Sequence, residues 1–464
     1  MRAVRLITEP FEFMNYLKLE SVKEVNCHGK LRLTGMISAE KEQEYRLAAS
    51  RETWVSIKAV SETGEERYFF NGILTGMEIR REDQVRIMTV ELRTGSFLLD
   101  LAEHTRSFQG AGFRYSDMIR ICMEAAGGLF IMPDRNKMAP GPLFLQYRET
   151  DWAFIKRVAS HAGVAVIPED ATPGKKLYLG WRAHSVKEAP VPDSCRMEQD
   201  YEGYRKRTAS GMKQLRASDF TGYHIRTREI YDLGENIRFE GQELVIGKAT
   251  SWLEGQELYH EYHLIHKNAG LLPVLYNQKA VGVSLTGTVQ AVRTTEVKVK
   301  LQEDENQEKC RSCWFDYATV YSTPDGTGWY CMPEIGDEIR LVLPDRDENH
   351  AYAAGSIHVG SAGGRTNPDE KSWKNKQKKE IVFTPEAVIM RNNAGLLLEL
   401  SDQKGIRICS DKDIFVQSEG DIRIQSKGAG IQMSAESHIR MQQGAAQIQM
   451  EDKIHISGGK IYMN

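Results

Sequence analysis

Apolar and polar positions alternate in short, regularly spaced units along the last sixty residues of the chain. Two apolar residues separated by one other residue form a pair, and successive pairs begin 6 to 9 residues apart. Alternate residues of a strand point to opposite faces, so each pair predicts one short strand with an apolar face. The paired positions are Ile406, Ile408, Ile414, Val416, Ile422, Ile424, Ile431, Met433, Ile439, Met441, Ile448, Met450, Ile454, Ile456, Ile461 and Met463.

A repeat of about eight residues provides one strand and one turn, which leaves the apolar face without a cover from its own chain. Single-chain β-solenoids cover that face by coiling into longer rungs. Three chains wound about one axis would cover it instead, with Arg407, Arg423 and Arg440 facing water. We therefore predict a trimeric β-helix, or β-prism, over residues 381–464. A meander packed against another domain is the alternative.

The rest of the chain is also predicted to be mainly β. Residues 1–275 read as strands separated by glycine-containing or charged loops. Two helical segments interrupt them at about 112–163, one beginning near Ser116 and one running from Thr150 to Gly163.

A compact block of strands follows over residues 280–360. About five strands in some 80 residues suit a small Greek-key barrel such as the OB-fold. Residues 361–380 are polar and lysine-rich without apolar periodicity, which predicts a linker.

Composition and charge narrow the class of protein. The 464 residues are enough for about three domains. The net charge of −3 argues against a nucleic-acid or membrane-surface binder, because both need a basic face. The odd number of cysteines, seven, argues against a disulfide scaffold. We expect neither a signal peptide nor a transmembrane segment, since no apolar run of suitable length occurs.

Three cysteines are the candidates for a metal site. Cys310 and Cys313 form a Cys-x-x-Cys pair, and Cys331 follows. Structural zinc takes four ligands, and no fourth residue stands at a recognisable spacing. We expect free thiols there, with a metal site as the alternative.

The histidine-rich stretch LYHEYHLIH at 258–266 does not fit a metalloprotease helix. His260 and His263 lack the spacing of His-Glu-x-x-His, and as a strand they point to opposite faces. We expect polar positions on a barrel strand. No defensible nucleophilic or paired-carboxylate grouping occurs, so no catalytic residue and no cofactor are predicted.

Two motifs stand out within the predicted elements. The helical motif consists of Tyr147, Glu149, Asp151, Trp152, Phe154, Arg157 and Gly163. The OB motif, in MPEIGDEIRLVLP, consists of Pro333, Glu334, Gly336, Asp337 and Glu338. With these motifs, the order of strand-rich first half, OB-like block and repeat resembles the VgrG-type spike proteins of type VI secretion systems and related extracellular injection particles. It also resembles the fused hub and spike of contractile phage tails.

The resemblance implies a trimeric hub over 1–275 with two tube-like β-barrels, an OB-fold collar and a needle. Such a protein nucleates a baseplate and adapts a six-fold tail tube to a three-fold, membrane-puncturing spike. The implied partners are two further copies, the tail tube protein, baseplate proteins, and a PAAR-type tip protein with effector cargo. The residues expected to dock the tip are Lys460, Ile461, Tyr462, Met463 and Asn464.

Some members of this family insert an enzyme between the OB block and the needle. The linker at 361–380 is too short for one, so we expect a bare, non-enzymatic spike. We expect it to be made and assembled in a bacterial cytoplasm and delivered outward in an injection particle, meeting a membrane only during puncture. The alternatives are a tail-associated cell-wall-degrading enzyme and a glycan-binding, fibre-like module.

Overall fold

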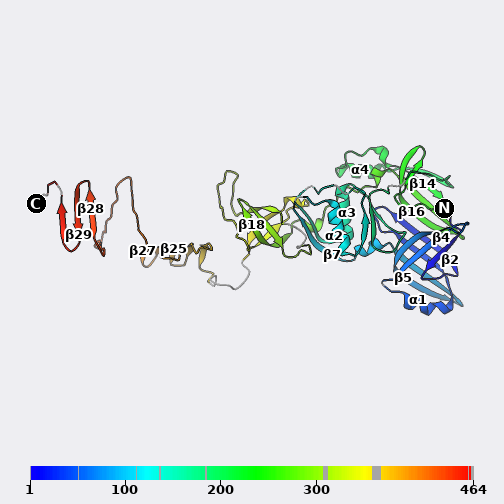
Figure 1. The fold of residues 1–464 in the computed structure, drawn as a ribbon, viewed down its shortest axis with the longest axis horizontal. Helices are drawn as coiled ribbons and strands as arrows, with labels where there is room; N and C mark the ends of the chain where they lie inside the picture. The colour runs from blue at the N-terminus through cyan, green and yellow to red at the C-terminus, as the bar shows by residue number, and fades with distance from the viewer. Residues whose placement is uncertain are drawn as a thin grey trace. The chain divides into compact units, whose positions relative to one another are not determined.

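The computed structural model of the chain divides into two compact units, residues 1–359 and residues 360–464. It describes residues 2–50, 52–110, 112–134, 137–139, 141–182, 185–306, 312–357, 367–457 and 459–460. The fold is mainly β, as the alternating sequence pattern predicts (Figure 1). Among the described helices, none is long and apolar enough to span a bilayer.

Twelve of the described strands form one sheet in the first unit. Its main path runs through β1 (Arg5–Glu9), β4 (Trp54–Val60), β5 (Glu66–Glu82), β6 (Val85–Arg93), β3 (Lys30–Ile37), β2 (Asn15–Glu24), β16 (Gln242–Glu254), β17 (Glu257–Ile265), β14 (Thr221–Thr227) and β13 (Ser194–Gln199). Two further strands, β15 (Asn236–Phe239) and β12 (Lys187–Glu188), branch from β16.

In the region where two tube-like barrels are expected, the described strands form two halves of a single sheet. The halves are joined because the long strand β16 pairs with β17 on one side and with β2 on the other. Each half still has its own buried cluster, one around Phe11 and Phe70 and the other around Tyr262 and Leu264.

The predicted helical insert lies between the two halves in the chain. Helices α2 (Tyr115–Ala125) and α3 (Asp151–Ala162) form at the predicted positions and share one core, in which Phe108 stacks on Phe154. The accompanying strands are β7 (Glu103–Gln109), β8 (Leu129–Ile131), β9 (Leu143–Thr150), β10 (Val166–Pro168) and β11 (Lys176–Leu179).

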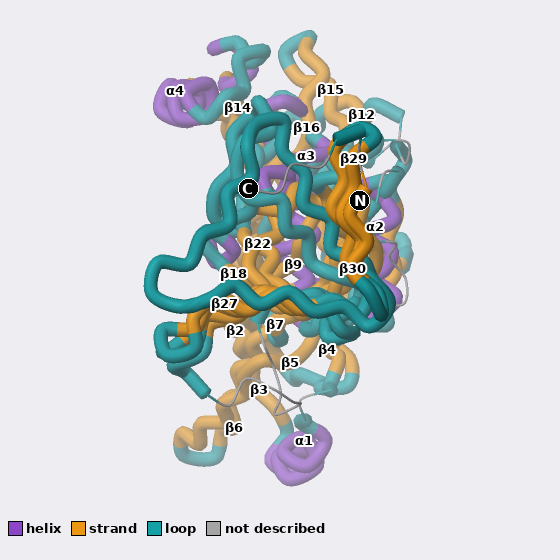
Figure 2. The backbone as a smooth tube through the Cα atoms, turned by 90° about the vertical axis from the view of Figure 1, so that its left-hand side faces the viewer, coloured by secondary structure: helices purple, strands orange, loops and turns teal. Residues whose placement is uncertain are grey.

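Two short helices at the edges of the hub have no counterpart in the sequence-based prediction. Helix α1 (Glu42–Ala48) and helix α4 (Tyr201–Ala209) lie at opposite edges of the first unit (Figures 1 and 2). The described 3-10 helices are η1 (Ala39–Lys41), η2 (Gly95–Leu99), η3 (Ala217–Phe220), η4 (Lys267–Gly270), η5 (Gln278–Ala280) and η6 (Glu348–His350).

The predicted OB block is a closed five-stranded barrel in the first unit. Its strands, in spatial order, are β18 (Ser284–Arg293), β19 (Glu296–Leu301), β20 (Trp314–Ala318), β22 (Tyr352–Ser356) and β21 (Glu338–Val342). Leu143 and Leu145 of β9 are buried in the same cluster as the barrel residues. The hub and the barrel therefore share apolar packing.

The second unit contains two separate antiparallel sheets. The first consists of β23 (Lys371–Lys374), β24 (Glu380–Phe383), β25 (Ala387–Arg391), β26 (Leu397–Ser401) and β27 (Gly405–Cys409). The second consists of β28 (Ile439–Gln443), β29 (Ala446–Met450) and β30 (Ile454–Ser457). The intervening residues 410–438 are loops and bends, drawn in teal in Figure 2.

Strand β23 lies inside the segment that the sequence predicts to be a linker. Only four residues long, it is too short for an apolar periodicity to be recognised. It forms because Trp373 continues an apolar row on the neighbouring strand, opposite Ile381. Residues 361–366 of that linker lie outside the described residues.

Candidate functional site

Helix α3 places the polar residues of the helical motif at the boundary between the hub and the OB barrel. The Thr150 side chain caps the helix by accepting a hydrogen bond from the amide of Ala153, 3.1 Å away. Gly163 ends it in the left-handed conformation, with φ of 65°. These two signals fix where the helix begins and ends, so they fix which residues face the barrel.

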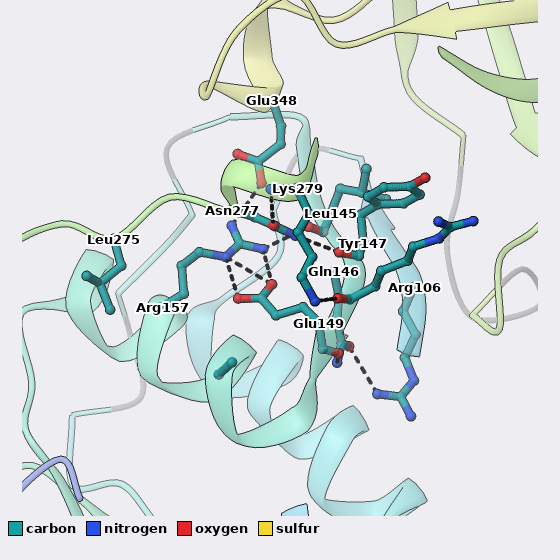
Figure 3. Close-up of polar contacts among 12 residues, drawn as sticks. Arg106, Leu145, Gln146, Tyr147, Glu149, Arg157, Leu275, Asn277, Lys279 and Glu348 are labelled. Carbon is teal, nitrogen blue, oxygen red and sulfur yellow. Dashed lines mark hydrogen bonds and ion pairs between the residues drawn. The ribbon is translucent and has the colours of Figure 1, made fainter. Parts of the chain in front are cut away.

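Arg157 is the centre of a buried ion-pair network (Figure 3). Its side chain is 2% exposed. Its Nη2 donates to Glu149 Oε2 at 2.9 Å and to the Leu145 carbonyl at 2.7 Å, and its Nε lies 3.2 Å from both Glu149 oxygens. Its Nη1 donates to Glu348 Oε1 at 2.8 Å. Because Glu348 belongs to η6 between two barrel strands, this ion pair connects the hub to the OB block.

The electrostatics of this network depend on each partner being present. Burial raises the pKa of Glu149, while Arg157 opposes that rise. The guanidinium carbon of Arg157 also lies 4.5 Å from the ring centre of Phe144. Two buried carboxylates therefore share one buried cation, and removal of that cation would leave both uncompensated.

A second buried network surrounds Asp151 at the start of α3. Arg106 of β7, 5% exposed, forms an ion pair with Asp151. Gln146 Nε2 donates to Asp151 Oδ1 at 3.0 Å and to the Glu149 carbonyl at 2.9 Å, so it bridges the two networks. His104 Nε2 lies 3.7 Å from Asp151 Oδ2.

The loop that follows β19 runs along β7 and is fastened to it. The Ser107 amide donates to Asp304 at 2.9 Å, and the Thr105 amide donates to Glu305 at 3.1 Å. Asn306 Nδ2 donates a hydrogen bond to the Ser107 carbonyl at 3.0 Å. With the Arg157–Glu348 pair, this loop gives the OB block two polar attachments to the hub.

The other motif residues have structural places in the same region. Trp152 is buried, with its ring centre 4.2 Å from that of His28, and Phe154 is fully buried in the α2–α3 core. The Tyr147 carbonyl accepts from Asn277 Nδ2 at 2.8 Å. Within the helical motif, Tyr147, Glu149 and Arg157 thus lie at the joint between hub and barrel, whereas Trp152 and Phe154 belong to the core of the helical insert.

The OB motif forms the turn that begins β21. Asp337 accepts a hydrogen bond from the Glu334 amide at 2.8 Å, and Gly336 adopts φ of 92°. Pro333 is buried, and Glu338 is the first residue of the strand. The motif is therefore a folding element of the barrel.

One face of the five-stranded sheet in the second unit is apolar and uncovered. The strand register places two rows of side chains on that face. The rows are Trp373, Ile381, Met390, Leu398 and Ile408, and Phe383, Val388, Leu400 and Ile406. Ile406 is 74% exposed and Ile408 is 62% exposed. Nothing within the described part of the chain covers this face.

The second sheet repeats the arrangement. Ile439, Met450 and Ile454 align across its three strands, and so do Met441, Ile448 and Ile456. The remaining described pairs lie in the loops and bends of 410–438 and are also exposed: Ile414, Val416, Ile422, Ile424, Ile431 and Met433. Ile461 and Met463 lie outside the described residues.

The predicted tip and cysteine positions are only partly described. Of the five tip residues, only Lys460 is described, and Ile461, Tyr462, Met463 and Asn464 are not. Cys310 lies outside the described residues, while Cys313 is buried and Cys331 is exposed. Burial raises the pKa of Cys313 to about 12, which keeps its thiol protonated at neutral pH.

A cluster of Glu198, His224 and His263 on the hub sheet has no counterpart among the predicted sites. Their ligand atoms lie within 4.8 Å of one another. His263 belongs to the histidine-rich stretch, but its two neighbours come from strands distant in sequence. Only the register between β13, β14 and β17 reveals this cluster.

Two family profiles match the chain. The phage tail baseplate hub (GPD) family matches residues 25–221, and the type VI secretion system/phage-baseplate injector OB domain matches residues 285–358. Together they span more than half of the 464 residues. No sequence among the curated proteins matches the chain.

Several solved structures share the fold. A type VI secretion system component from E. coli, c3393, described as similar to the T4 bacteriophage tail proteins gp27 and gp5, has a TM-score of 0.54 at 11% identity. That alignment covers 76% of this chain and 100% of the other. The half-lidded PdpA-VgrG complex of Francisella has a TM-score of 0.55 at 7% identity, covering 85% of this chain and 83% of the other.

The order of the matched domains agrees with the fold. The baseplate hub profile covers part of the twelve-stranded sheet and the whole helical insert, and the injector profile covers the closed barrel. The predicted OB-fold is therefore confirmed, and so is the resemblance to the hub and spike proteins. The chain therefore carries a phage tail baseplate hub (GPD) domain followed by a type VI secretion system/phage-baseplate injector OB domain, and it resembles the VgrG-type hub and spike proteins of contractile injection systems.

Proposed function

We propose that three copies of the chain form the central hub and spike of an injection particle, with residues 381–464 of each copy building a shared needle. The uncovered apolar face of the second unit carries this proposal. Isolated soluble chains rarely expose contiguous apolar surface of this extent. Two further copies of the chain would best bury this face, because each copy would bring an equivalent apolar face to a common axis.

The segment 410–438 supports intertwining over simple side-by-side packing. It carries three of the apolar pairs but forms no strand within the described part of the chain. Backbone amide and carbonyl groups need hydrogen-bond partners once they are buried. Strands from the two other copies would supply them and would bury the pairs at the same time.

The hub would act as the adaptor in this assembly. We propose that its sheet halves, the two tube-like barrels of the sequence-based prediction, face the tail tube, and that the OB collar passes load to the needle. Baseplate proteins would bind around the hub, and a PAAR-type tip protein with effector cargo would bind at residues 460–464. The particle would assemble in a bacterial cytoplasm and meet the target membrane only on puncture.

We propose further that the chain acts without catalysis. The matched families are described as a phage tail baseplate hub and a baseplate injector OB domain, and neither description names a catalytic activity, which supports this proposal. An assay of peptidoglycan clearing by the purified full chain tests the alternative, a cell-wall-degrading enzyme. Clearing above the level of a buffer control would replace the structural function with a cell-wall hydrolase.

Light scattering tests the trimer. The full chain should have three times the mass of 52.7 kDa. Deletion of residues 367–464 should yield a folded species of lower oligomeric state, because residues 1–359 form a compact unit of their own. A monomeric full chain with a cooperatively folded second unit would overturn the shared needle.

A further inference from the structure

Three potential metal ligands meet on adjacent strands of the hub sheet. His224 of β14 stands directly opposite His263 of β17, and their rings stack with centres 4.2 Å apart. On the other side of β14, Glu198 of β13 lies 2.6 Å from His224 Nε2, measured from its Oε2 atom. Among the described residues, this is the group of three histidine, cysteine or carboxylate side chains close enough to share one ion.

A glycine makes room for this approach. Gly222 lies opposite Glu198, and a Cβ atom at Gly222 would stand only 2.5 Å from His263 Nε2. Glycine weakens a strand unless a close approach requires it. The absent side chain lets the His263 ring extend over β14 toward the strand of Glu198. Glu198 and His263 both line a cavity of about 360 Å³.

His263 is not committed to another partner. Within the described part of the chain, neither of its ring nitrogens has a hydrogen-bond partner, and its ring stacks on that of His224. The unprotonated ring nitrogen of His263 is therefore available to bind an ion.

We propose that Glu198, His224 and His263 bind one divalent transition-metal ion, best fitted by Zn²⁺. Two imidazoles and one carboxylate are a common zinc ligand set, with water in the fourth position. Bound ligand atoms stand about 2.0–2.2 Å from zinc and therefore roughly 3–3.5 Å from one another. Glu198 Oε2 and His224 Nε2, 2.6 Å apart, would have to separate, and the His263 ring would have to turn out of its stacking on His224. Glu198 is on an exposed strand and can move in this way.

A second carboxylate lies near the other ring nitrogen of the central ligand. Glu261 Oε1 lies 3.7 Å from His224 Nδ1, whereas Glu198 contacts the other ring nitrogen. Metal-bound histidines commonly direct their other nitrogen to a carboxylate in this way. The positive charges of Arg196 and Lys248 lie in the same cross-strand row, and Glu24 pairs with Lys248 at 3.5 Å. The two flanking glutamates thus balance the charge around the ion.

The ion would fasten the edge of the hub sheet. Strand β13 is almost entirely exposed, and helix α4, which follows it, has no buried residue. Few apolar contacts therefore hold this segment. A cross-link from Glu198 to two inner strands would stabilise the edge, since metal binding free energy adds to the stability of the folded form.

Metal binding to the full chain, purified without a polyhistidine tag, tests the proposal. Equilibrium titration with Zn²⁺, and with Co²⁺ followed by visible absorption, should show one ion per chain. Glu198→Gln and His263→Gln should each weaken binding by more than about 100-fold, because loss of a second-shell partner alone costs roughly 10- to 100-fold. His350→Gln is the matched control, since His350 pairs with Asp345 on the exposed surface.

Zn²⁺ should also slow amide hydrogen exchange in β13 of the original chain and leave it unchanged in Glu198→Gln. Glu198 is exposed, so this variant should fold, and circular dichroism would verify that. Absence of binding at saturating Zn²⁺ would overturn the proposal. So would equal affinity in the original chain and in both ligand variants, which would place the ion elsewhere.

Discussion

At the scale of single residues, His260 is held neutral inside the hub. It is fully buried, its Nδ1 lies 2.7 Å from Ser251 Oγ, and its Nε2 has no partner among the described residues. Burial, with added repulsion from Lys23 and Arg67, lowers the pKa of His260 to about 3. At pH values at which the unfolded chain binds a proton at His260, the folded chain therefore leaves this side chain unprotonated.

This difference predicts a pH-dependent stability. As pH falls from about 6.5 toward 4, the unfolded state gains a proton at His260 that the folded state does not, so His260 contributes a loss of stability of about 1.4 kcal/mol per pH unit. His260→Asn should remove this one-proton slope while keeping a group that can bond Ser251. Urea unfolding of the full chain at several pH values measures it. The exposed His438→Asn should keep the slope, and an equal slope in all three proteins would contradict the assignment.

The sequence predicts the faces of these histidines but not their partners. Alternation correctly puts His260 and His263 on opposite faces of one strand, and the structure has the first buried and the second beside His224. The partners Ser251 and Glu198 lie on other strands. Their approach depends on strand register, which a single sequence does not reveal.

At the scale of elements, Gly163 decides how α3 ends. Its φ of 65° is unfavourable for residues with a side chain, whereas a Cβ atom there would meet nothing closer than Lys137 Nζ, 3.9 Å away. Space is therefore available, and Gly163→Ala should cost about 1–2 kcal/mol through the backbone alone. Gly163→Asn should cost less, because asparagine tolerates this conformation. Thermal unfolding of both variants checks the order, and an Asn variant less stable than the Ala variant would contradict it.

Two neighbouring residues of β27 allow substitutions on the apolar face and on the opposite face to be compared. Ile408 lies in the apolar row, whereas Arg407 points to the opposite face and stands opposite Glu399. Ile408→Asn should lower the resistance of the assembly to heat and detergent, because each copy loses roughly 1.5–3 kcal/mol of apolar burial. Arg407→Asn should have little effect. Gel migration without heating and light scattering measure both, and equal effects would indicate that this face stays exposed in the assembly.

The sequence correctly predicts those elements that carry a recognisable pattern within their own residues, such as an apolar stripe or a regular repeat. Helices α2 and α3 combine an apolar stripe with a recognisable beginning or end, and the needle repeat has its period. Helix α4 buries no residue, so it has no apolar stripe to detect, and α1 has only seven residues. Residues 410–438 carry the pattern of strands without forming them in the single chain. Their pattern fits strand partners on other copies, which matches the proposed intertwining.

At the scale of the whole molecule, the hub and the OB block are joined by buried charge as well as by apolar packing. Arg157 compensates Glu149 in the hub and Glu348 in the barrel, and all three are nearly inaccessible to solvent. Such a network contributes little net stability as a whole. We predict that it favours one geometry of the joint over its neighbours. For a spike under axial load, a joint with one geometry would transmit force without bending.

The network around Arg157 predicts that substitutions of its members have strongly non-additive effects on the free energy of unfolding. Arg157→Met leaves two buried carboxylates without a cation and should destabilise the first unit by about 3–5 kcal/mol. Because burial raises the pKa of Glu149, this carboxylate should protonate as the pH falls, so the loss should be larger at pH 8 than at pH 5. Adding Glu149→Gln and Glu348→Gln should recover much of the loss, since no unpaired charge remains.

Lys279→Met is the matched control for this set, because its ion pair with Glu103 also joins the barrel side to β7 but is about half exposed. Exposed pairs contribute about 0–1 kcal/mol, so this variant should be nearly neutral. Urea unfolding of each protein at both pH values provides the comparison. If Arg157→Met were as mild as Lys279→Met, solvent would have to reach the network, and the joint would be a loose contact. Alternatively, Arg157→Met could be strongly destabilising and the triple variant could recover the lost stability. That result would show that charge compensation, more than the volume of the arginine, holds the OB block in its place on the hub.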